Sequence, residues 1–347
     1  SVTADVTAGI TAKTDVSSTT GTEGGGWFGG GGASSITGIV ATNVVQSGAT
    51  ATVTNSDLST TTSGNVMVDA TNTAVIDADA INASRSGGSA IGVTLAFNSI
   101  GWAAQNVLFN TIDTIIGNTE IADALGANTG AGATAYLLDT EVNAAGAVSV
   151  SATAGAQLTS DAENTSESSA SGAFDASGLS FGAVVSQNKV SSKADAYIDF
   201  SDTYAGLKQV QAVSGVSVGA TDSAVIDASI TLVANADAET GDFLGNFGAA
   251  DANGYAFAVS LNDVRGGATA YIEDATVTST AGDISVTADE TAGITAKTEV
   301  SSTTSTEGGG WFGGGGASSI TGIAATNVVQ SGATATVTNS DLTTTSG

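Results

Sequence analysis

The sequence predicts an all-β protein whose fold class is a β-solenoid, similar to a parallel β-helix and built from irregular tandem units. Three observations predict it: the chain repeats itself at two levels, apolar and polar residues alternate along extended segments, and Pro is absent. Alternation with a period of two is typical of strands, and Pro would interrupt long hydrogen-bonded ladders. A tandem array of β-sandwiches stays open as the alternative, although units of unequal length favour stacked turns, which tolerate insertions.

Composition limits the classes of protein that this chain represents. Seven Lys and Arg stand against 34 Asp and Glu in 347 residues, so the net charge is −27 and nucleic acid is not an expected partner. No run of eighteen apolar residues occurs, so we expect no transmembrane segment in this sequence. Aromatic residues make up only 5% of the chain, which predicts a narrow interior filled by Ala and Val.

The longer repeat has a period of 284 residues. Residues 1–58 match residues 285–342 at 54 of 58 positions, and both copies contain the segment EGGGWFGGGGASS. So close a match indicates tandem duplication within a long gene, and we expect the chain to be a segment of a larger repetitive protein.

A shorter unit recurs four times inside that period. Each copy contains an Asn strand such as "ATNVV", a second strand such as "ATAYI" and a longer segment such as "GNVMVDATNTAVIDADA". In the second copy the "ATAYL" strand arrives late, which predicts an insert at 101–129. The predicted units are 1–23 (the end of a preceding unit), 24–86, 87–170 (with the insert), 171–240, 241–307 and 308–347 (the start of the next long repeat).

The longer segment predicts a strand with one buried face. Alternate residues from Val66 to Ala80 are apolar, except at Asn72. The equivalent residues in the other copies are Val6, Ala154, Asp222 and Glu290. Because this position accepts so many residue types, we predict that it is exposed and forms a corner between two short strands.

The recurring Asn shares the phase of small and branched apolar residues, so we predict that it points inward. A buried amide without a partner costs about 1–3 kcal/mol, and stacked Asn side chains in successive rungs can pair with one another. The alternative is that each Asn caps a turn. The predicted structural ladder comprises Asn43, Asn98, Asn188, Asn262 and Asn327.

Aromatic residues gather in glycine-rich connections that precede the Asn strands. Trp27 and Phe28, repeated as Trp311 and Phe312, are candidate contact residues. They either pack over the small-residue interior or stand exposed as a contact surface. A second aromatic row, predicted on the outer face, serves either packing between rungs or carbohydrate stacking; its members are Tyr136, Tyr197 and Tyr271.

The sequence does not predict an enzyme. Without His or Cys, the commonest general bases and transition-metal ligands are missing. No cofactor is expected other than calcium, which prefers the carboxylate oxygens that this chain has in excess. The candidate calcium ligands are Asp77, Asp79, Asp237 and Glu239, with solvated negative surface as the alternative.

Together, the near-identical long repeats, the strand periodicity and the Ala-, Gly-, Thr- and Asp-rich composition resemble the repetitive regions of giant bacterial surface proteins, namely filamentous-haemagglutinin-like proteins and large repeat adhesins. The resemblance implies an extracellular or cell-surface filament that is structural and non-catalytic. Its length would be set by the number of repeats, and it would give reach and attachment. The expected partners are other copies in a fibre, or further repeats of one chain. The alternative is a binding module that contacts glycans, hydrophobic surfaces or other filaments through the aromatic loops and the Tyr row.

Overall fold

The structure, a computed structural model, describes residues 1–21, 32–102, 130–172, 175–240, 249–307 and 315–345. It confirms the prediction of an all-β fold of the β-solenoid type, because three sheets of parallel strands stack along one axis. No helix occurs among these residues.

Two of the sheets are long and the third is short. The strands of sheet A are β1 (Val2–Thr20), β5 (Val66–Ser86), β9 (Val148–Gly172), β12 (Val216–Thr240) and β15 (Ile284–Glu307). The strands of sheet B are β2 (Ser34–Val45), β3 (Gly48–Thr54), β6 (Ser89–Ile100), β7 (Ala131–Leu138), β10 (Ala176–Asp199), β13 (Ala250–Glu273) and β16 (Ala317–Thr338). The strands of sheet C are β4 (Asp57–Ser59), β8 (Glu141–Ala144), β11 (Gln209–Ala212), β14 (Thr276–Ser279) and β17 (Asp341–Thr344).

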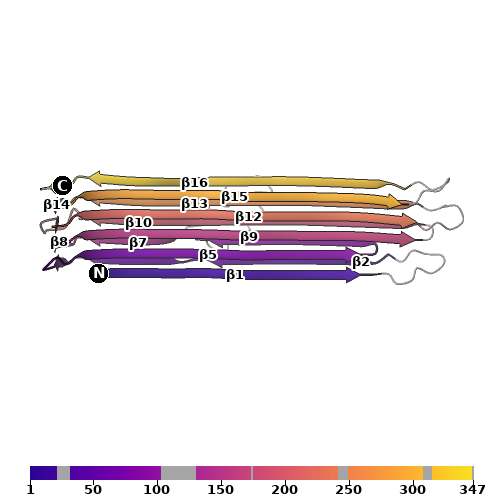
Figure 1. Ribbon diagram of the computed structural model, residues 1–347, viewed down its shortest axis with the longest axis horizontal. Helices are drawn as coiled ribbons and strands as arrows, with labels where there is room; N and C mark the ends of the chain where they lie inside the picture. The colour runs from indigo at the N-terminus through magenta and orange to yellow at the C-terminus, as the bar shows by residue number, and fades with distance from the viewer. Residues whose placement is uncertain (22–31, 103–129, 173–174, 241–248, 308–314, 346–347) are drawn as a thin grey trace.

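One rung of the solenoid consists of a long strand in sheet A, a return along sheet B and a short strand in sheet C. Sheet A strands point one way and sheet B strands point the other, and sheet C closes the end where both termini lie (Figure 1). Five rungs are present, and β1 and β15 are four rungs apart, so the 284-residue repeat corresponds to four rungs.

The described chain is longest along its strands and not along the stacking axis (Figure 1). A strand of 25 residues such as β9 spans about 80 Å, whereas each rung adds about 4.8 Å to the stack. One 284-residue repeat therefore adds about 19 Å. The rung has the form of a broad, flat blade, so repeats thicken the stack slowly.

The alternation of buried and exposed residues explains the long strands. The apolar residues from Val66 to Ala80 that were predicted to face inward are all buried in the core between sheets A and B. Their small size lets the two sheets approach each other without bulky side chains between them, in keeping with the low aromatic content.

The predicted corner at Asn72 is wrong, because β5 passes through this residue without a break. Asn72 is 0% exposed, and Asp222 at the equivalent position of β12 is 1% exposed. At two rungs a small residue of sheet B faces this column and gives its carboxyl group room. Ser192 faces Asp222, and Gly266 faces Glu290.

The true corner lies between sheets B and C. In four of the five rungs a short polar residue adopts a left-handed backbone there, with φ between 46° and 52°: Asn55, Asp139, Asp274 and Asn339. Asn and Asp tolerate this conformation better than other non-glycine residues. The sharp turn lets the chain enter the short strand of sheet C.

The insert predicted at 101–129 interrupts one rung without disturbing its neighbours. The chain leaves sheet B after Ile100 and returns at Ala131, and both β6 and β7 pair with successive parts of β10. Residues 103–129 lie outside the described part of the chain.

Candidate functional site

The five asparagines of sheet B form a hydrogen-bonded column along the stacking axis. Each Nδ2 donates to the Oδ1 of the next rung, at 2.8 Å from Asn43 to Asn98, 2.9 Å from Asn98 to Asn188, 2.9 Å from Asn188 to Asn262 and 2.8 Å from Asn262 to Asn327. We call this column the Asn ladder. Its three inner members are buried, so the amides supply each other's hydrogen bonds inside the core.

Serine hydroxyls accept the second amide hydrogen at the inner rungs of the Asn ladder. Asn98 donates to Ser160 Oγ at 2.9 Å, and Asn188 and Asn262 each donate to a Ser two residues earlier at 3.2 Å. The inner amides are thus fully used, as a buried amide requires. At the two ends, Asn43 keeps an unused acceptor and Asn327 an unused donor among the described residues.

A second polar column lies in sheet A, and sequence reasoning assigned it to the surface. The Asp222 carboxylate accepts hydrogen bonds from the Ser192 hydroxyl and from Gly267 N–H, the latter at 2.9 Å. Glu290 lies beside it over Gly266, where its carboxyl group leaves no room for a Cβ atom. We call this the acid column, after Asp222 and Glu290. The sequence does carry a signal for its burial, because these residues occupy the same alternate positions of the strands as the buried apolar residues.

Burial controls the protonation of this carboxyl pair. It raises the pKa of Asp222, although the hydrogen bonds from Ser192 and Gly267 oppose the rise. Burial, and then the neighbouring Asp222 carboxyl, raise the pKa of Glu290 to about 8. The pair therefore holds a proton near neutral pH.

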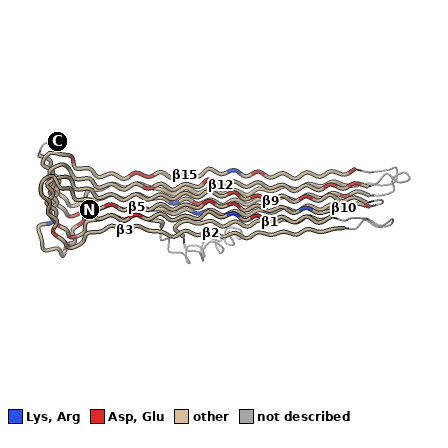
Figure 2. Tube along the Cα trace, turned by 60° about the horizontal axis from the view of Figure 1, so that its bottom comes forward, with Lys and Arg blue, Asp and Glu red and all other residues tan. Residues whose placement is uncertain are grey.

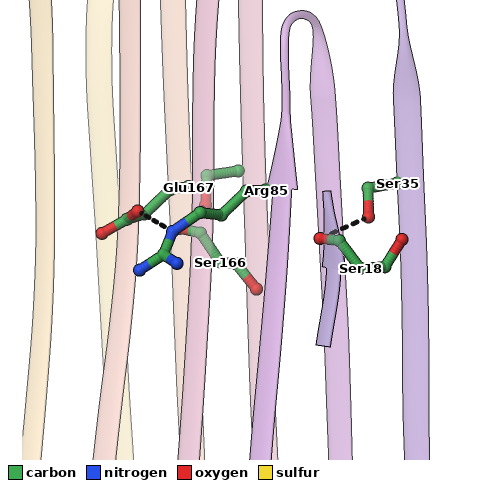
Figure 3. A network of polar contacts seen from close by, with 6 residues as sticks. Ser18, Ser35, Arg85, Ser166 and Glu167 are labelled. Carbon is green, nitrogen blue, oxygen red and sulfur yellow. Dashed lines mark hydrogen bonds and ion pairs between the residues drawn. The ribbon is translucent and has the colours of Figure 1, made fainter. Parts of the chain in front are cut away.

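Toward the end opposite sheet C, hydroxyl groups replace apolar side chains in the interior. Ser84 donates to the carbonyl and hydroxyl oxygens of Ser35 at 3.0 Å, and Ser35 lies 3.4 Å from the carbonyl oxygen of Ser18. Figure 3 shows the contact between Ser35 and Ser18. It also shows the exposed ion pair between Arg85 and Glu167, in which the nitrogen and oxygen atoms are 2.6 Å apart. The serine contacts hold sheets A and B together where few large apolar residues are present.

The tyrosines stack on the outer face of sheet B. Ring centroids are 4.6 Å apart from Tyr136 to Tyr197 and 4.7 Å apart from Tyr197 to Tyr271, with an interplanar angle of 4° in both pairs. Partial burial raises the pKa of Tyr271 to about 12. Because the rings stack in parallel, the faces between them are covered and the row presents ring edges outward. A sugar that stacks on a ring face finds little room there.

The candidate calcium ligands fall into two separate groups. Asp77 and Asp79 face outward from β5, whereas Asp237 and Glu239 face outward near the far end of β12, two rungs away. Figure 2 shows acidic residues scattered along the strands and at the corner beside sheet C, with few basic residues between them. Within the described ranges no three acidic residues form a group that could hold a metal ion.

Trp27, Phe28, Trp311 and Phe312 lie outside the described residues. The strands on either side of them are described, and they locate the connections. The described strands of sheet A end, and those of sheet B begin, at the edge of the blade opposite sheet C (Figure 1).

Comparisons of the chain with protein-family models, curated proteins and solved structures find no match. The described ranges contain no helix that could cross a lipid bilayer. The features that can indicate a function are therefore the stack of rungs and its surfaces.

Proposed function

We propose that this chain is a non-catalytic structural segment of a long bacterial filament at the cell surface, used for attachment between cells or to other surfaces. The observation that carries the proposal is continuity along the stack. Every long strand pairs in parallel register with the next rung, and the Asn ladder crosses all five rungs. Such a structure extends by adding identical repeats, and each rung contacts only its neighbours.

The dimensions favour breadth over reach as the useful property of this filament. A repeat of 284 residues lengthens the stack by about 19 Å, about a quarter of the length of one long strand. A filament of this kind presents the outer faces of sheets A and B again at every rung. We infer that these surfaces, repeated many times, provide the contacts with other cells or surfaces.

Chains that carry one, two and three copies of the 284-residue repeat test the proposal. We expect small-angle scattering to give one particle dimension that grows by about 19 Å per repeat, while the blade width and thickness stay constant. Repeats that scatter as independent beads on a flexible chain would contradict the proposal.

A second candidate function is binding through the aromatic connections. The observation that favours it is that the strands on either side of these connections end at one edge of the blade, because weak contacts repeated along one row add to a strong attachment. Glycan-array and hydrophobic-surface binding of the wild type against Trp27→Ala/Phe28→Ala tests this function. A loss of binding in the variant supports a contact role, whereas equal binding leaves the filament as scaffold alone.

A further inference from the structure

The outer face of sheet B carries apolar side chains on the three inner rungs of the stack. They are the alternate residues of 91–95 in β6, 181–185 in β10 and 255–259 in β13, which lie in register with one another. The residues between them are buried in the core, so these side chains point outward. We call them the apolar patch. Within it Phe181 and Phe257 have ring centroids 6.2 Å apart.

The strands that carry the apolar patch are apolar on both faces. Segments such as LSFGAVV in β10 and YAFAVSL in β13 are nearly continuous apolar runs, whereas the segment AENTSESS of β9 in sheet A is mostly polar. Continuous apolar runs are typical of parallel strands that are covered on both faces. Phe257 is nevertheless 41% exposed, so this face has room for a partner.

Charge distinguishes this face from the outer face of sheet A. The core beneath the apolar patch includes Ala80 and Ala162 of sheet A. The residues beside these two alanines are Asp79, Asp161 and Glu163, and their carboxylates point outward. The apolar patch itself contains no charged residue. Because each chain has a net charge of −27, two copies meet with less repulsion through sheet B than through sheet A.

The columns of the apolar patch run along the stacking axis with the spacing of the rungs. Leu95, Val185 and Val259 lie in register in successive rungs, and Val40 belongs to the same column in the first rung. Adjacent rungs are about 4.8 Å apart. A partner that covers every rung must repeat with the same spacing, and a second blade of this chain does so.

We propose that two copies of the filament pair side by side, with their apolar patches face to face and the outer faces of sheet A turned to solvent. The partner is a second copy of this chain. The inference rests on the proposed filament function and assigns the contact between filaments to sheet B. Packed sheets lie about 10 Å apart, a distance that side chains such as Phe181 and Phe257 fill from both sides.

The area of the apolar patch predicts how many repeats a stable pair needs. The patch is about 16 Å wide along the strands and gains about 4.8 Å at each rung, so the four rungs of one 284-residue repeat supply about 320 Å². A standard interface covers about 800 Å² on each partner. We therefore expect one repeat to be too small for a stable pair and about three repeats to be sufficient.

A matched pair of double variants, introduced into every repeat, tests the pairing and the face that it uses. Val185→Asp/Val259→Asp places carboxylates in the apolar patch, and Val225→Asp/Val233→Asp places them at equally half-buried positions on the outer face of sheet A. In sedimentation equilibrium we expect one wild-type repeat to remain monomeric and three tandem repeats to form dimers. The patch variant should weaken this dimer at least about tenfold, whereas the sheet A variant should pair like wild type.

Phe257→Ser is a milder probe, because it removes an exposed ring without adding charge, and it should also weaken the dimer. Circular dichroism checks that all variants fold. Three results would overturn the proposal: three repeats that stay monomeric, a dimer that both patch variants leave unchanged, or an equal loss of pairing in the sheet A variant. A monomeric chain that an octyl-coated resin retains would mean that the patch binds a different apolar partner, which also overturns it. If pairing fails while one scattering dimension still grows with each tandem repeat, the filament function stands without it.

Discussion

Two columns of polar residues cross this core, and they differ in how the hydrogen bonds that burial removes from water are replaced. The Asn ladder places the same residue in every rung, so each amide pairs with the next one. The acid column changes residue at every rung and depends on sheet B for partners. Asp222 receives hydrogen bonds from Ser192 and Gly267, while both amide atoms of Asn72 are buried and unpaired among the described residues.

The two columns show two ways in which a solenoid tolerates polar residues in a narrow core. A ladder of identical residues satisfies itself, but every member then depends on two neighbours. A mixed column lets each rung vary, and a facing small residue such as Gly266 provides the room. Substitution should therefore lower the free energy of unfolding strongly in the Asn ladder. In the acid column it should lower it little, or even raise it.

The largest effect is expected from Asn188→Leu, because Leu has nearly the shape of Asn but leaves Asn98 Nδ2 without its acceptor in the ladder and Asn262 Oδ1 without its donor. Unfolding by urea should show a loss of about 1–3 kcal/mol. A neutral result would mean that the ladder contributes nothing to stability.

The matched change in the other column is Asn72→Leu. The amide of Asn72 has no hydrogen-bond partner among the described residues, so its removal relieves a desolvation cost. We expect a gain of about 1 kcal/mol in the same urea assay. A loss as large as that of Asn188→Leu would show that the two columns do not differ.

Stability should also depend on pH through Glu290. Its pKa rises from the ordinary Glu value of about 4.3 to about 8 in the folded chain. Folding therefore favours the protonated form, so the contribution is full below pH 4.3 and disappears as the pH rises through about 8. Asp222 is the titratable group that faces it.

The variant Glu290→Val isolates this dependence, because the first copy of the repeat carries Val6 at the same position. Melting temperatures of wild type and variant should converge near pH 4 and separate near pH 9, where the variant is the more stable. Parallel melting curves across this range would contradict a buried, protonated Glu290.

Much of this fold follows from periodicity in the sequence. The phase of the alternation predicts which side chains point inward, and the recurring Asn strands predict which residues stack. The Asn separations of 55, 90, 74 and 65 residues are those of the hydrogen-bonded pairs. The insert at 101–129 also follows from the pattern, since the strand after it resumes the register of β10.

The acid column could not be predicted, because a strand pattern does not reveal which columns of two sheets face each other. Asp222 and Ser192 are 30 residues apart and lie in different sheets and rungs. Variation at position 72 and its equivalents resembled the variation of a surface site. The great length of each rung could not be predicted either. The sequence pattern predicts a corner at Asn72, whereas β5 continues through this residue.

The smallest effect is expected on the outer face of sheet A, where two carboxylates of successive rungs lie above one another. Asp79 of β5 is in register with Asp161 of β9, and partial burial, together with the charge of Asp79, raises the pKa of Asp161. A divalent cation can relieve this repulsion or bridge two blades. Calcium should therefore increase light scattering more than sodium at matched ionic strength.

Asp79→Asn/Asp161→Asn should remove that excess scattering, whereas the matched change Asp237→Asn/Glu239→Gln on the distant group should leave most of it. The expected difference is small because the face is flat, and calcium prefers six to eight oxygen ligands, more than these carboxylates supply. Equal scattering in the two salts would leave only general screening, which acts over about 10 Å at 0.1 M.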